Sequence, residues 1–223
     1  MRYSRLEFSR FSAAPFVTDP LDITLGGLGG VGAYVAFFLS RLRHNLYCYE
    51  MDTVEDINLD CQFFKYEDLG KNKADAVADM IYKYCNKHIN PLGKYEAGCE
   101  VTPYCFAMFD NMEARKLMFE EWCKLPEKKK VFIDTRLQAE EFQIFCVHKE
   151  EHTQMYLDSL RRDDEIPDLP CSYKQTGHYA AMVSTQAVAL LCNYLANQKH
   201  LVDIGEEIRE VPFFHTFNGL TWQ

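Results

Sequence analysis

A glycine-rich segment near the start of the chain constrains the fold more than any other feature. Residues 27–32 read Gly-Leu-Gly-Gly-Val-Gly, a G-x-G-x-x-G pattern between an apolar strand candidate at 21–25 and helical apolar spacing at 33–42. Glycines here permit a tight strand-to-helix turn and let backbone N–H groups and a helix N-terminus approach phosphate oxygens. The segment therefore predicts a nucleotide site, whose binding residues are Gly27, Gly29, Gly30 and Gly32.

An acidic residue follows at a distance typical of nucleotide-binding folds. Residues 46–50 form a second strand candidate that ends in Glu50, 21 positions after Gly29. A carboxylate at that point can accept hydrogen bonds from ribose hydroxyls. A nicotinamide-dependent oxidoreductase would have the same loop and the same acid, and these two features alone favour that more populous class.

Strand and helix candidates alternate along the first part of the chain. Helical patterns cover 73–85 and 112–123, and strand candidates cover 95–101, 105–109 and 131–134. The alternation predicts an α/β fold: a Rossmann-like, mostly parallel twisted sheet with helices on both faces. The C-terminal part adds a strand at 142–148, an apolar helix from Tyr179 and a strand at 211–217. We expect a single domain over residues 1–223, with a mobile loop at 149–176.

Composition narrows the partners and the compartment. The net charge of -9 makes nucleic acid an unlikely partner, because binding a phosphate backbone requires clustered Lys and Arg. Nine cysteines occur without a C-x-x-C pair, so no zinc site is expected, and a reducing cytoplasm is the natural compartment. The longest apolar stretch, 179–196, is interrupted by polar residues and is expected to be a buried helix rather than a membrane span.

Further motifs favour ATP over a dinucleotide. Four segments follow one another in the chain: Glu-Met-Asp-Thr-Val at 50–54, Asn-Leu-Asp-Cys-Gln at 58–62, Asp-Leu-Gly-Lys-Asn-Lys-Ala at 68–74 and Phe-Asp-Asn at 109–111. Arg115 follows the last of them. This order resembles the adenylyltransferase superfamily that contains the ubiquitin-activating enzymes and the sulfur-carrier activators ThiF and MoeB. The resemblance extends over most of the chain, up to Ser-Thr-Gln-Ala at 184–187, which is similar to the family's segment rich in Gln and Ala.

The resemblance implies ATP and Mg²⁺ as cofactors and assigns roles to individual residues. It places Lys73 on the phosphates, Glu50 on the ribose and Asp110 on the metal, since a carboxylate at a strand's C-terminal end can hold Mg²⁺. The same nucleotide site includes Asp52, Asn58 and Gln62. Two alternatives stay open: Lys73 as a solvated side chain at a helix start, and the Asp110–Asn111 pair as a helix N-cap.

The chain also departs from the family pattern. Cys61 stands where relatives carry arginine, and a thiol cannot replace a guanidinium that bridges phosphates. Lys71 or Arg136 could supply the missing cation. Arg5 resembles an N-terminal arginine that relatives insert into a partner subunit, which implies a homodimer, with a surface arginine in the N-terminal tail as the alternative. Cys171 is the candidate thiol for receiving an activated carboxylate, with an unreactive loop cysteine as the alternative.

These observations lead to one main hypothesis and two rivals. The chain is expected to adenylylate the C-terminal carboxylate of a small ubiquitin-like or sulfur-carrier protein ending in Gly-Gly. Its catalytic residues would be Lys73, Asp110, Arg5 and Cys171. The first rival is a catalytically degenerate binding subunit that docks a carrier or partner protein. It would have lost its activity when cysteine replaced the family arginine at position 61. The second is the nicotinamide-dependent oxidoreductase.

Overall fold

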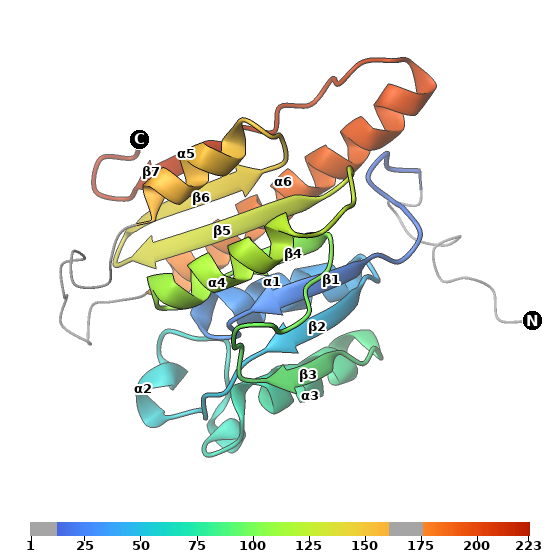
Figure 1. Cartoon of the computed structure of the whole chain (residues 1–223). Coiled ribbons are helices and arrows are strands. Elements are labelled where there is room, and N and C mark those ends of the chain that lie inside the picture. The colour runs from blue at the N-terminus through green and yellow to red at the C-terminus, as the bar shows by residue number, and fades with distance from the viewer. Residues whose placement is uncertain (1–12, 161–175) are drawn as a thin grey trace, which may run out of the picture.

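The computed structural model describes residues 13–160 and 176–223. It contains a seven-stranded sheet of order β3-β2-β1-β4-β5-β6-β7 (Figure 1). The neighbouring strands from β3 to β5 are parallel, and β6 and β7 are added antiparallel. The strands are β1 (Asp22–Gly26), β2 (Asn45–Tyr49), β3 (Asn90–Gly93), β4 (Tyr104–Ala107), β5 (Val131–Gln138), β6 (Glu141–Val147) and β7 (Phe214–Asn218). The expected Rossmann-like α/β fold is confirmed.

Helices cover both faces of this sheet. Helices α1, α3 and α6 pack on one face, whereas α4 and α5 pack on the other (Figure 1). The helices are α1 (Gly30–Arg41), α2 (Asp56–Leu59), α3 (Lys73–Cys85), α4 (Met112–Cys123), α5 (His152–Ser159) and α6 (Gly177–Asp203). Each face has its own hydrophobic core. Because β3, β2, β1, β4 and β5 are parallel, their carboxyl ends lie on the same side of the sheet.

Helix α6 is the apolar helix that the sequence predicts. With 27 residues it is the one described helix that could cross a membrane by length and composition, yet 61% of its apolar window is buried inside the protein. It packs along α1, β5 and β6. Its polar residue Ser184 is satisfied, because the hydroxyl donates to the carbonyl of Val31 or Ala180 at 2.9 and 2.6 Å. The expectation of a buried helix is confirmed.

One strand expectation is wrong, and one loop expectation is corrected in part. Residues 95–101 form no strand, and the edge strand is β3 instead, whose four residues are all exposed and include Pro91. Tyr95 is buried in a loop by edge-to-face packing on Tyr49, with ring centroids 4.9 Å apart. The loop predicted at 149–176 contains α5, which is anchored by the fully buried Tyr156. Residues 161–175 of that loop lie outside the described part of the chain.

Candidate functional site

A cavity of about 1800 Å³ lies at the carboxyl ends of the parallel strands. Strand order reverses between β1 and β4, and such a switch point is where open α/β sheets bind ligands. The cavity collects site residues that are far apart in sequence. Those that line it are Gly27, Gly29, Gly30, Glu50, Asp52, Asn58, Cys61, Gln62, Lys73 and Asp110.

The glycine loop makes a turn that other residues could not make. Gly27 has a φ of 87°, and a Cβ there would lie 2.7 Å from the Met108 carbonyl oxygen. A Cβ on Gly32 would overlap the Gly27 carbonyl oxygen. Gly32 is buried in the first turn of α1 and is not among the residues that line the cavity, so it permits close packing of helix and loop. Gly29 and Gly30 line the cavity at the start of α1.

The Glu50 carboxylate braces this loop, a role that the sequence did not indicate. Its Oε2 accepts a hydrogen bond from Leu28 N at 2.7 Å. Its Oε1 accepts from Met51 N and Asp52 N, both at 2.9 Å. The carboxylate therefore ties the glycine loop to the end of β2. A role in binding ribose stays a prediction for Glu50.

Lys73 is held against the cavity wall rather than in solvent. Its side chain is only 9% exposed, and its Nζ lies 3.1 Å from Asp52 Oδ2. The backbone repeats the connection, because Lys73 N donates to Asp52 O at 2.9 Å. Asn72 fixes the start of α3 by accepting a hydrogen bond from Ala74 N. The alternative of a solvated lysine is therefore wrong, and Asp52 holds the amine in place.

Buried polar atoms without partners gather around the cavity. Within the described part of the chain, three such atoms belong to residues that line it: Gln62 Oε1, Tyr95 OH and Thr135 Oγ1. Gln62 Oε1 lies 3.7 Å from the position that a Cβ on Gly29 would occupy. Buried acceptors in native proteins are nearly always satisfied, so a donor from a ligand or from water is expected at Gln62.

Asn58 has a structural role that the sequence did not indicate. Its Oδ1 accepts a hydrogen bond from Glu55 N at 2.9 Å and so caps the short helix α2. Since Asn58 also lines the cavity, the phosphate contact implied by the resemblance stays a prediction.

Asp110 lies where a metal carboxylate was expected, after the end of β4. The cap of α4 is Asn111, whose Oδ1 accepts from Ala114 N at 2.8 Å, so the N-cap alternative holds for Asn111. Asp110 is exposed to the cavity and accepts a hydrogen bond from Asn111 Nδ2 at 3.2 Å. The described residues contain no group of three His, Cys, Asp or Glu that could hold a metal. Mg²⁺ in ATP sites is usually held by one or two carboxylates together with phosphates, and Asp110 fits that arrangement.

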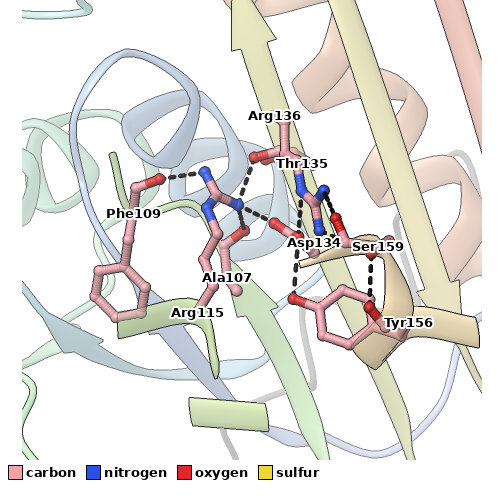
Figure 2. Close-up of polar contacts among 8 residues, drawn as sticks. All are labelled: Ala107, Phe109, Arg115, Asp134, Thr135, Arg136, Tyr156 and Ser159. Carbon is pink, nitrogen blue, oxygen red and sulfur yellow. Dashed lines mark hydrogen bonds and ion pairs between the residues drawn. The ribbon is translucent and has the colours of Figure 1, made fainter. Parts of the chain in front are cut away.

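The substitutes proposed for the family arginine do not fill its place. Cys61 lines the cavity, and burial raises the pKa of its thiol. Lys71 is not among the cavity-lining residues, because its Nζ pairs with Asp68 and Asp79 at 3.1 and 3.2 Å, so this expectation is wrong. Arg136 does line the cavity, but its guanidinium is bonded to Asp134 and Ser159 (Figure 2). The expected site residues Arg5 and Cys171 lie outside the described residues.

Comparisons with known proteins place the fold. No protein-family model and no curated protein matches the chain. Among solved structures, PaaA aligns with a TM-score of 0.65 at 13% identity, covering 93% of this chain and 63% of PaaA. MccB of E. coli crystallised with ATP aligns with a TM-score of 0.59 at 13% identity, covering 91% of this chain and 64% of MccB.

The MccB structure with AMPCPP and MccA gives a TM-score of 0.58, also at 13% identity, with 91% and 64% coverage. This chain therefore spans less than two thirds of these proteins. The class that the geometry defines is a Rossmann-like α/β fold of the kind found in PaaA and MccB, with a cavity at its switch point.

Proposed function

We propose that this chain binds ATP with Mg²⁺ and adenylylates the C-terminal carboxylate of a peptide or small carrier protein. The observation that carries the proposal is the convergence of the glycine loop, Lys73, Gln62 and Asp110 on one cavity. MccB, which has the same fold, has been crystallised with ATP and with MccA, and this likeness adds support.

The residues divide the work of phosphate binding. Backbone N–H groups of the glycine loop and the start of α1 receive the phosphates. Lys73 moves part of its hydrogen bonding from Asp52 to a phosphate oxygen, over a short distance because the amine already lies at the cavity wall. Asp110 would hold the metal ion, which would neutralise negative charge on the phosphates.

The reaction forms one bond and breaks one bond. A carboxylate oxygen of the acceptor attacks the α-phosphorus of ATP, giving an acyl-adenylate. The bond between that phosphorus and the bridging oxygen breaks, and its electron pair leaves with pyrophosphate. Negative charge grows on the leaving group, and the Lys73 ammonium stabilises it.

The size of the cavity supports an extended acceptor. Pockets for small ligands commonly have volumes of about 300–1000 Å³. The cavity of about 1800 Å³ has room for a nucleotide and a flexible tail. Our proposal for the acceptor is a ubiquitin-like or sulfur-carrier protein ending in Gly-Gly. We retain as further proposals a cytoplasmic homodimer in which Arg5 completes the partner's site, and a thioester on Cys171.

Pyrophosphate exchange tests this function. The protein is mixed with ATP, Mg²⁺, labelled pyrophosphate and synthetic tails that end in Gly-Gly. We expect exchange only with a free terminal carboxylate, and none with the same tail amidated. An absence of ATP binding by calorimetry, together with an absence of exchange, would overturn the proposal.

A second function is favoured by the site around Cys61. Position 61 carries a thiol, and the Arg136 guanidinium is bonded to Asp134. The described part of the cavity near α2 therefore lacks a cation in the place of the family arginine. A binding subunit of this kind would bind ATP or a tail without turnover. Stabilisation by NAD but not by ATP in thermal unfolding would instead favour an oxidoreductase.

A further inference from the structure

A buried charge cluster joins three elements beside the cavity. Asp134 in β5 is fully buried, and Figure 2 shows groups from α4, β5 and α5 converging on its carboxylate. Arg115 Nη1 donates to Oδ1, while Arg136 Nε and Tyr156 OH donate to Oδ2 at 2.9 and 3.0 Å. One side chain in the middle of the sheet therefore connects both helices of this face.

Arg115 connects Asp134 to the segment between β4 and α4 that carries Asp110. Its guanidinium donates to the carbonyl oxygens of Ala107 and Thr135 at 3.3 and 2.9 Å, and also to that of Phe109 (Figure 2). Ala107 ends β4, and Phe109 directly precedes Asp110. Because a guanidinium is planar and donates in fixed directions, its orientation sets the path of this connection.

Arg136 connects the same carboxylate to the end of α5. Its Nη1 and Nη2 donate to Ser159 O and Oγ at 3.0 and 3.1 Å. The guanidinium also lies over the Phe145 ring, 4.2 Å from the centroid. Ser159 is the last residue of α5 and lines the cavity. Asp134 thereby holds two parts of the cavity wall.

Stability alone is a poor reason for this cluster. A buried ion pair is costly to desolvate and is often no more stable than well-packed apolar residues. The neighbouring strand residues Phe132 and Ile133 are fully buried and apolar, so the strand is built for such packing. The best-attested use of buried charged groups is to fix one arrangement among several.

We propose that Asp134 is a positioning residue for the ATP site. Through Arg115 it fixes the connection from β4 to α4 that presents Asp110, and through Arg136 it fixes the end of α5. The link to metal binding rests on the function proposed above. The positioning of the two segments does not depend on that function.

Two conservative variants test the two connections that Asp134 makes, one through Arg115 and one through Arg136. Arg115→Lys and Arg136→Lys keep the charge but replace the planar fork by a single nitrogen, which cannot reach the same acceptors together. Tyr156→Phe is the control, because it removes one hydrogen bond from Asp134 and leaves both arginines in place. Asp134→Asn affects both connections at once, and the two lysine variants carry the test even where Asp134→Asn does not fold.

Hydrogen exchange followed by mass spectrometry reads the positions directly. We expect Arg115→Lys to lose protection at Ala114 N, the amide capped by Asn111, and Arg136→Lys to lose protection in α5 only. Ala74 N, capped by Asn72 in α3, serves as the internal reference and should stay protected in every variant. Unchanged protection at Ala114 in Arg115→Lys, or equal loss in Tyr156→Phe, would overturn the proposal.

Metal dependence provides the second readout. We expect Arg115→Lys to raise the Mg²⁺ concentration for half-maximal ATP binding by about tenfold, as for other residues that orient a metal ligand. Tyr156→Phe should leave that concentration unchanged within about twofold, since it leaves Arg115 paired with Asp134. A wild-type protein without Mg²⁺-dependent ATP binding would refute the proposed function. The exchange data would then decide the positioning role by themselves.

Discussion

Replacing Lys73 by methionine should separate the proposed ATP binding from folding. The substitution keeps a long unbranched side chain and removes the ammonium group. In the structure that group is paired with Asp52, whose side chain is 49% exposed. A pair with one half-exposed partner contributes less than about 1 kcal/mol to stability. We therefore expect the free energy of unfolding to fall by no more than that amount.

The effect on ATP should be much larger. A charge-assisted hydrogen bond to a phosphate oxygen contributes about 1.5–3 kcal/mol. Since about 1.4 kcal/mol corresponds to a tenfold change in affinity, Lys73→Met should raise the Kd for ATP by roughly 10- to 150-fold. Isothermal titration calorimetry in the presence of Mg²⁺ measures this change.

Lys71→Met is the matched control, because it removes the same charge two positions away. The Lys71 amine is bonded to Asp68 and Asp79 and is not among the cavity-lining residues. We expect its Kd for ATP to stay within about twofold of wild type, because an exposed charge acts weakly at a distance in salt. Equal weakening by both variants, or an unchanged Kd in Lys73→Met, would refute the assignment.

Three further predictions concern other parts of the chain. Cys61→Arg places a cation at the cavity and should increase the rate of pyrophosphate exchange. If the protein binds ATP and the variant shows no faster exchange, the binding-subunit function is favoured. Gly27→Ala should destabilise the protein by at least about 1–2 kcal/mol in urea unfolding, because its φ of 87° is left-handed and the new Cβ meets the Met108 carbonyl; wild-type stability would contradict this reasoning. Burial of the imidazole lowers the pKa of His44 to about 4, and the positive charge of Lys87 adds a smaller effect in the same direction. Protonation of His44 therefore favours unfolding, so stability should fall by about 3 kcal/mol as the pH drops from 6.5 to 4, and His44→Asn should remove this part of the pH dependence.

Much of the fold could be predicted because apolar periodicity and burial agree. The pattern at 112–123 matches α4 residue for residue, and that at 73–85 matches α3. The edge strand β3 could not be predicted in this way, since none of its residues is buried. Residues 95–101 misled because an apolar residue such as Tyr95 can be buried from a loop.

The candidate site could be predicted only in part. The glycine loop, Lys73 and Asp110 have recognisable spacing, and the structure brings them to one cavity. The bracing by Glu50 depends on how its side chain folds back on the backbone. One sequence feature indicates the cluster around Asp134, namely a charged residue at the end of the apolar run at 131–134. Its partner Arg115 is 19 positions away, and only the packing of α4 on the sheet pairs them.

The three hydrogen bonds accepted by Glu50 have a consequence for the thermodynamics of the proposed nucleotide binding. They immobilise the cradle while the chain folds, so the entropic penalty for ordering it falls on folding and not on association. A glutamine at this position, which accepts through one oxygen only, would transfer that penalty to the encounter with ATP. Calorimetry should then show weaker binding with a less favourable entropy, although the atoms that touch the phosphates are unchanged.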